Sequence, residues 1–148
     1  QYQTVNCFLT SNEKKEVQTS TIFKQLWDKQ KTTFVPVSNY LDYSMICASY
    51  KHNSILENDS HQIPYPTEYT KEDPVNIDLL ICPLLAFDNK GFRVGYGKGM
   101  YDRFLEKCSG NVVTVGLSFF DPITEISDVN SLDKKMDFVV TPKGIHSF

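Results

Sequence analysis

The stretch DLLICPLLAFDNKGFRVGYGKGMYDRFL, residues 78–105, decides how the rest of the chain is interpreted. It opens with the short apolar run 79–82, which is typical of a buried strand, and Pro83 then removes a backbone donor and ends that strand. Four of the seven glycines in the chain follow within nine positions. They are Gly91, Gly95, Gly97 and Gly99. A helix is expected directly after them, over residues 101–107.

A strand, a glycine loop carrying cations and a helix start form an arrangement that binds phosphate. The backbone N–H groups and the positive end of the helix dipole face the anion, and Lys98 adds a mobile charge. The two common nucleotide fingerprints do not match, because Gly99 stands where GxxxxGK[ST] needs Ser or Thr and the run reads GxGxG rather than GxGxxG. From these residues alone, a glycine-rich surface turn therefore remains the alternative to a phosphate site.

The whole string 83–105 resembles the signature of the 5-formyltetrahydrofolate cyclo-ligase family, whose members are also called methenyltetrahydrofolate synthetases. The matching pattern is P-x-x-x-F-D-x-x-G-x-R-x-G-x-G-x-G-x-Y-D-R-x-L. Segments outside it agree in the expected order. They are residues 16–19, 32–36 and 63–66, and the closing run 133–141.

The resemblance implies cyclisation of 5-formyltetrahydrofolate to 5,10-methenyltetrahydrofolate, with ATP as co-substrate and Mg²⁺ as cofactor. It assigns catalysis to Arg93 and Lys98, and magnesium binding to Asp102 and Asp133. The ATP site it implies consists of Arg93, Gly95, Tyr96, Gly97, Lys98, Gly99, Met100 and Tyr101. The folate site it implies consists of Glu16, Tyr96, Lys98, Met100 and Tyr101.

Several of these residues also have a purely structural interpretation. Asp102 could cap the helix it begins, and Asp133 could be a turn residue before the strand that follows it. Glu16 falls in the first turn of an expected helix, where a carboxylate is favourably placed on the dipole. Tyr101 could be a packing aromatic. Residue pattern alone leaves these alternatives open.

Two departures from the family pattern affect the expected function. Met100 replaces the first of two adjacent tyrosines, and the chain is expected to be a single domain, 1–148, that lacks the family's N-terminal basic helix. The alternative function is accordingly a non-catalytic folate- or nucleotide-binding protein of the same fold. A third hypothesis, that the polar segment 51–73 docks a structural partner, rests only on its polarity.

The pattern of short apolar runs predicts an α/β layered fold with a central, mainly parallel sheet flanked by helices. The resemblance implies that this fold is of the NagB/RpiA/CoA-transferase-like type. Strands are expected over residues 5–9, 32–37, 43–50, 79–82, 112–117 and 138–141, the last of these being the final strand. A first helix is expected over 13–31, with Lys14 and Lys15 on its solvated side. Residues 51–73 are expected to be surface loop, including His61, although 63–66 could wall the substrate pocket.

Composition limits the partners and the compartment. The net charge of -3 argues against a general nucleic-acid-binding surface, whereas a local cationic region suits a small anionic substrate. The four cysteines are widely spaced, which favours free thiols in a reducing compartment over a zinc site. Since no stretch is long and apolar enough to cross a membrane, we expect a cytoplasmic monomer that acts on small molecules.

Overall fold

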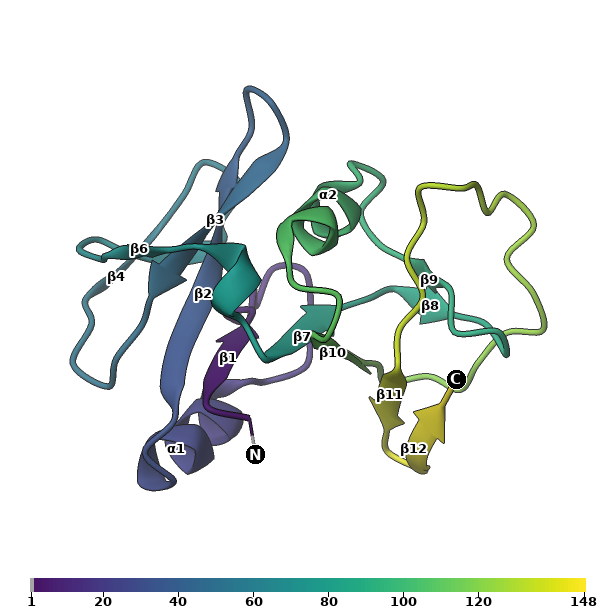
Figure 1. Ribbon diagram of the computed structural model, residues 1–148, viewed down its shortest axis with the longest axis horizontal. Helices are drawn as coiled ribbons and strands as arrows, with labels where there is room; N and C mark the ends of the chain where they lie inside the picture. The colour runs from purple at the N-terminus through teal and green to yellow at the C-terminus, as the bar shows by residue number, and fades with distance from the viewer. Residues whose placement is uncertain (1) are drawn as a thin grey trace.

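The computed structural model describes residues 2–148, and its centre is one eight-stranded sheet in the order β12-β11-β10-β7-β1-β2-β3-β6 (Figure 1). The five inner strands from β11 to β2 are parallel, and the three outer strands β12, β3 and β6 pair antiparallel. The sheet strands are β1 (Thr4–Cys7), β2 (Thr32–Asn39), β3 (Ser44–Ser49), β6 (Lys71–Glu72), β7 (Leu79–Pro83), β10 (Val113–Leu117), β11 (Phe138–Thr141) and β12 (Gly144–Ser147). The predicted mainly parallel sheet is confirmed.

The strands at the middle of the sheet are apolar on both faces because a helix or a loop covers each face. In β7, residues from Leu80 to the end of the strand are buried, and the strand pairs with β10 from Leu79 to Pro83. Pro83 is the last residue of β7, so the strand is one residue longer than the predicted 79–82 and stops at the proline. The strand that leads into the glycine-rich stretch is therefore rigidly held between β1 and β10.

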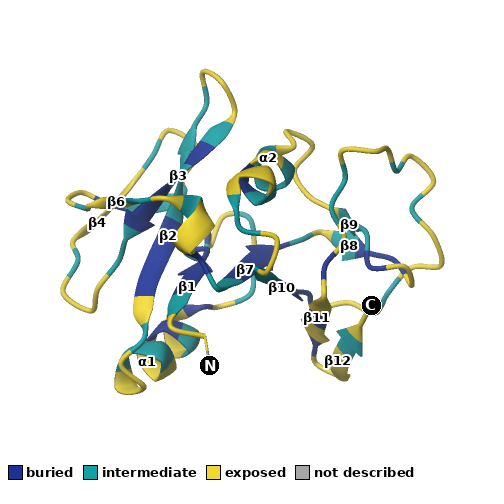
Figure 2. Cartoon of the chain, in the orientation of Figure 1, coloured by how far each residue is buried: buried dark blue, intermediate teal, exposed yellow. Residues whose placement is uncertain are grey.

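Two short helices pack on opposite faces of the sheet (Figure 1). Helix α1 (Ser20–Asp28) buries Phe23 against side chains that include Val5 and Val35. Helix α2 (Met100–Lys107) buries Phe104 on the other face, beside Leu80. Figure 2 shows the resulting dark band of buried strands between exposed helix surfaces.

The helix predicted over residues 13–31 is wrong at its N-terminal end, since α1 begins at Ser20. Residues 12–15 instead form a turn in which Lys15 donates its N–H to the Asn12 carbonyl at 3.1 Å. Lys15 adopts a positive φ of 53°, which interrupts helical geometry. The Thr19 hydroxyl donates to the Phe8 carbonyl at 2.9 Å and ties this segment back to the end of β1.

Two further predictions of local structure need correction. The segment 51–73, predicted to be surface loop, contains three short strands, β4 (Leu56–Asn58), β5 (Pro64–Pro66) and β6. Strands β4 and β5 pair as a hairpin, and β6 extends the main sheet. The strand 138–141 is not the last one. The chain reverses after Pro142 and β12 pairs antiparallel with β11.

The glycine-rich stretch divides into a β-hairpin and a loop. Strands β8 (Ala86–Phe87) and β9 (Arg93–Val94) form a hairpin, and Gly91 lies in its turn with φ 87°. A Cβ atom at Gly91 would lie 2.7 Å from Cγ of Phe148, so this glycine permits close packing of the C-terminal residue. Only residues 95–99 remain as a glycine loop.

Among residues 2–148, no helix is long and apolar enough to cross a membrane. The remaining regular element is the short 3-10 helix η1 (Pro74–Asn76), which leads into β7. Its backbone is capped by Asp73, whose carboxylate accepts the Val75 N–H at 3.1 Å.

Candidate active site

A cavity of about 830 Å³ opens where the carboxyl ends of β1, β2 and β7 come together, which is where ligands bind in parallel sheets. Its volume lies in the range of small-molecule sites, about 300–1,000 Å³. Every site residue predicted from the sequence lines it. These residues are Glu16, Arg93, Gly95, Tyr96, Gly97, Lys98, Gly99, Met100, Tyr101, Asp102 and Asp133.

The glycine loop 95–99 forms an open edge of this cavity. Gly97 has φ 78°, and Gly99 has φ 61° and is the N-cap residue of α2. Apart from their chain neighbours, no atom of residues 2–148 lies within 4 Å of the Cβ position of Gly95 or Gly97, so the space on that side of each glycine is open. Arg103 donates to the Lys98 carbonyl at 2.6 Å and fixes the loop to the helix.

Lys98 extends from this loop toward the connection between β2 and β3. Its Nζ lies 5.3 Å from the ring centroid of Tyr43, which also lines the cavity. Within residues 2–148, no carboxylate lies within 4.0 Å of this ammonium. The charge of Lys98 is therefore available to an anionic ligand.

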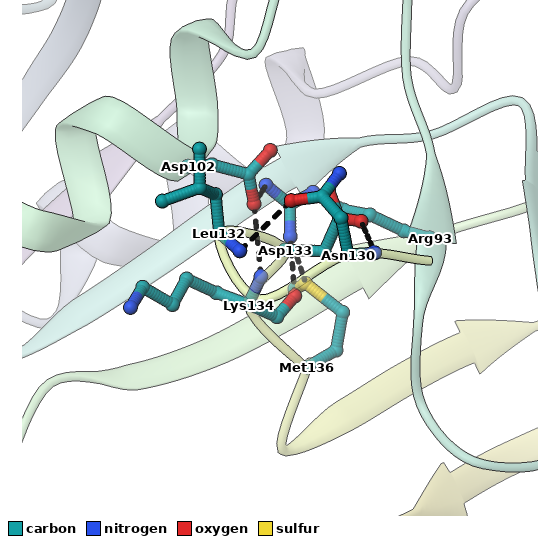
Figure 3. Close-up of polar contacts among 7 residues, drawn as sticks. All are labelled: Arg93, Asp102, Asn130, Leu132, Asp133, Lys134 and Met136. Carbon is teal, nitrogen blue, oxygen red and sulfur yellow. Dashed lines mark hydrogen bonds and ion pairs between the residues drawn. The ribbon is translucent and has the colours of Figure 1, made fainter. Parts of the chain in front are cut away.

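Arg93 is held very differently, in an ion pair with Asp102 (Figure 3). Nη2 of Arg93 lies 2.9 Å from Oδ1 of Asp102, and Nη1 donates to the Lys134 carbonyl at 2.8 Å. The Arg93 side chain is only 5% exposed. Asp102 does not cap its helix, since Gly99 occupies that position, and its Oδ1 also accepts the Lys134 N–H at 3.0 Å.

Asp133 lies in a tight turn beside this pair (Figure 3). Its Oδ2 accepts the Asn130 N–H at 2.7 Å, and its own N–H donates to the Asn130 carbonyl. Oδ2 of Asp102 and Oδ1 of Asp133 accept no hydrogen bond from residues 2–148. One oxygen of each carboxylate thus stays available to a ligand.

Glu16 and Tyr96 meet across the cavity. The Tyr96 hydroxyl donates to Oε1 of Glu16 at 2.8 Å, and Oε2 accepts the Ser11 N–H at 2.8 Å. Burial, together with the bond to Glu16, raises the pKa of Tyr96 above its usual value. Glu16 lies ahead of α1, so the helix-dipole interpretation of this carboxylate is wrong. Burial also raises the pKa of Tyr101.

The family model described as the 5-formyltetrahydrofolate cyclo-ligase family matches residues 1–142. The chain belongs to this family. The cyclo-ligase assignment predicted from the signature at residues 83–105 is thereby confirmed.

Curated cyclo-ligases and solved structures agree with this assignment. The chain is 31% identical to 5-formyltetrahydrofolate cyclo-ligase of Mus musculus, over 95% of this chain and 75% of that protein. It is 30% identical to the Escherichia coli (strain K12) protein of the same name, over 88% and 74%. The structure of Aquifex aeolicus 5,10-methenyltetrahydrofolate synthetase matches with a TM-score of 0.78 and 25% identity, over 99% and 72%. These matches confirm the α/β fold.

The cyclo-ligase cavity also contains residues that the sequence did not reveal. Tyr40 and His61 stack with ring centroids 3.9 Å apart, and both line the cavity. The Tyr40 hydroxyl donates to Asp59 at 2.8 Å, and burial together with this bond raises the pKa of Tyr40 to about 12. Ile63 also lines this cavity, so of the segment 63–66 it is the residue placed where it could contact a substrate. Tyr40 lies in the turn after β2 and His61 in the turn between β4 and β5, and no motif connects them.

Proposed function

We propose that this protein catalyses the ATP- and magnesium-dependent cyclisation of 5-formyltetrahydrofolate to 5,10-methenyltetrahydrofolate, with release of ADP and phosphate. Family membership supports this activity. The observation that carries it is that one cavity contains the free ammonium of Lys98, the carboxylates of Asp102 and Asp133, and Glu16 with Tyr96. A phosphate donor and a folate can therefore meet in one space.

The reaction requires positioning and charge neutralisation rather than a protein nucleophile. The N-formyl group is an amide, so its oxygen is a poor leaving group. Transfer of the γ-phosphoryl group of ATP to that oxygen gives an iminium-like phosphate ester. N10 of the same folate attacks the carbon of this ester, and loss of phosphate and of the N10 proton gives the methenyl product. In-line placement and cations around the phosphoryl oxygens are what such a transfer needs.

Lys98 and the glycine loop are assigned to the phosphates. The ammonium would leave the Tyr43 ring, 5.3 Å away, for a phosphate oxygen, because a charge-assisted hydrogen bond is stronger than a contact with an aromatic face. Successive backbone N–H groups around Gly97 and Gly99, both at positive φ, can form an anion-binding concavity.

Arg93 is assigned mainly to positioning. Its guanidinium is buried and engaged with Asp102 and the Lys134 carbonyl, which leaves it little access to the cavity. It would orient Asp102 and hold the Lys134 carbonyl and the Met136 sulfur, which follow Asp133 in the chain. The sequence predicted that Arg93 neutralises phosphate charge directly. The engaged guanidinium supports a positioning role more strongly than this direct role.

Asp102 and Asp133 would hold Mg²⁺. Both line the cavity, and proteins usually hold Mg²⁺ with one or two carboxylates while phosphates and water complete its shell. Each aspartate keeps one oxygen without a donor among residues 2–148. When bound, the metal would neutralise charge on the phosphates.

Glu16, Tyr96, Met100 and Tyr101 are assigned to the folate. Glu16 is an acceptor for the N–H groups of a pterin ring, and its Oε1 would share or exchange its bond to Tyr96. Met100 offers a flexible apolar contact.

Cys7, Cys47 and Cys82 are buried free thiols, which supports a location in a reducing compartment such as the cytoplasm.

The test follows the absorbance of methenyltetrahydrofolate with 5-formyltetrahydrofolate, ATP and magnesium. Lys98→Met should lower kcat/KM about 100-fold or more, as removal of one charge-stabilising donor does. Lys107→Met is the matched control, because Lys107 is an exposed lysine near the other end of α2, outside the cavity. Binding of both substrates by folded wild-type protein without product would contradict the enzymatic proposal and favour the non-catalytic binding protein.

A further inference from the structure

Lys14 is a cavity residue that the sequence pattern placed on a solvated helix face. The chain turns over residues 12–15 before α1 begins, and this turn brings Lys14 to the cavity wall. Its Nζ lies 4.1 Å from the ring centroid of Tyr96. Lys15, its neighbour in the same turn, is exposed and does not line the cavity.

The charge of Lys14 has no carboxylate partner in the part of the chain that the structure describes. The ion pairs found there are Lys24–Asp28, Lys90–Glu125, Arg93–Asp102 and Lys143–Asp121. Within residues 2–148, Lys14, Arg93 and Lys98 are the lysine and arginine residues that line the cavity, and of these only Arg93 is in an ion pair. The ammonium groups of Lys14 and Lys98 each rest on an aromatic ring instead. An oxyanion can displace an ammonium from a ring more easily than from a carboxylate.

Tyr96 connects Lys14 to the glycine loop. It lies two residues before Lys98, and its hydroxyl is held by Glu16 from the same segment that carries Lys14. The ammonium of Lys14 is therefore fixed against the loop that carries Lys98. Two free positive charges beside one loop suit a ligand with several negative oxygens, such as a phosphate chain.

We propose that Lys14 binds an oxyanion of a substrate in this cavity, as a second cation beside Lys98, and that the anion is the phosphate chain of ATP. The inference rests on the proposed function, since that function brings ATP to the loop. The glutamyl carboxylate of the folate has the same chemistry and is the other source of such an anion. Lys14 is thus a substrate-binding residue that no sequence motif identified.

The experiment compares wild type, Lys14→Met, Lys14→Arg and Lys15→Met. Lys14→Met removes the charge but keeps the length, and we expect its KM for ATP to rise about tenfold, the usual effect of losing one charged hydrogen bond. Lys14→Arg should recover most of the affinity, and Lys15→Met should match wild type. Calorimetric titration of each protein with ATP and magnesium should show the same tenfold change in Kd.

Outcomes of this comparison separate the two proposals. In one outcome, Lys14→Met raises only the KM for 5-formyltetrahydrofolate, and a substrate without the glutamyl group shows no difference between this variant and wild type. The anion is then the folate carboxylate, which overturns the assignment to ATP and supports Lys14 as an oxyanion-binding residue. Unchanged KM values for both substrates would overturn the inference while leaving the enzyme intact. If wild type forms no product, the proposed function fails, and the ATP titration alone decides for or against Lys14.

Discussion

Arg93 and Lys98 lie five positions apart, yet their charges are in different environments. Arg93 is 5% exposed and paired with Asp102, whereas Lys98 is exposed and forms no ion pair within residues 2–148. Removing one partner of a buried ion pair lowers the stability of the fold, because it leaves the other charge buried without compensation. The pair is therefore a structural unit as well as part of the site.

Asp102→Asn tests this double role. Removal of one charge from a buried pair destabilises proteins by about 3–5 kcal/mol, and since Asp102 is partly exposed and Asn retains an acceptor, we expect about 2 kcal/mol in urea unfolding. Activity should fall about 100-fold or more, with a higher magnesium concentration needed for half-maximal rate.

A suitable control for this variant is Asp121→Asn. Asp121 pairs with Lys143 at the surface, where both side chains are well exposed. Such pairs contribute little, so the free energy of unfolding should change by less than about 0.5 kcal/mol and the rate should not change. Equal losses in the two aspartate variants would contradict the special role of the Arg93 pair.

At the scale of elements, the β8–β9 hairpin and the glycine loop use glycine for different reasons. Gly91→Ala would combine a positive φ with a Cβ 2.7 Å from Phe148, and we expect a loss of about 2–3 kcal/mol. Gly97→Ala meets no atom within 4 Å and should lose only about 1 kcal/mol, from strain at its φ of 78°. Chemical denaturation gives both values.

The contact with Phe148 supplies an internal check on that prediction. In a Phe148→Ala background the space beside Gly91 is enlarged, so Gly91→Ala should then lose only the part that arises from backbone strain. An undiminished loss in that background would show that the Phe148 ring is not the cause.

Asp88 connects the hairpin to the segment that follows β10. Its buried carboxylate accepts the N–H groups of Lys90, Phe92 and Ile126 at 2.9–3.1 Å. Burial raises the pKa of Asp88, but these backbone bonds outweigh it and the pKa lies below its usual 3.8. The ionised carboxylate thus stabilises two segments that lead to the cavity.

This lowered pKa predicts the pH dependence of the Asp88→Asn variant. A depressed folded pKa adds stability above the unfolded value near 3.8, and this stability is lost as the pH falls through the folded pKa. The difference in unfolding free energy between wild type and Asp88→Asn should be constant above about pH 5 and shrink below pH 4. Urea unfolding at several pH values measures it. A difference that grows on acidification would contradict the assignment.

At the scale of the whole molecule, the cavity draws its walls from segments spread along the chain. The end of β1, the β2–β3 connection, the turn near His61, the glycine loop and residues 126–133 all contribute. Because these segments are brought together only when the sheet is formed, a ligand in the cavity binds the folded state and not the unfolded chain.

Binding should therefore raise the unfolding temperature. At a concentration about 100 times Kd a ligand adds about 2.7 kcal/mol, which corresponds to a rise of about 5–10 °C for a chain of this size. Thermal unfolding with ATP and magnesium, and separately with 5-formyltetrahydrofolate, measures the shift. At the same ATP concentration, the unfolding temperature of Lys98→Met should rise clearly less than that of wild type. If neither ligand raises the unfolding temperature of wild type, the assignment of the cavity is contradicted.

The sequence alone determined the properties that depend on local pattern. Short apolar runs predicted the parallel strands, because strands covered on both faces require apolar side chains throughout. The spacing of the glycines, Lys98 and Asp102 identified the loop and the family. The same local rules failed over residues 13–19, where the side chains fit a helix. Glu16 instead accepts the Ser11 N–H, and the Thr19 hydroxyl donates to the Phe8 carbonyl just after β1.

Only the tertiary structure decided which residues share the cavity and how their charges are used. Lys14 enters the cavity because a turn replaces the first part of the expected helix. Tyr40 stacks on His61 because the turn after β2 and the turn between β4 and β5 meet there. Arg93 and Lys98 look alike in the sequence, but burial beside Asp102 engages one charge and leaves the other free. Burial and partnership are properties of the packed molecule, which no local pattern encodes.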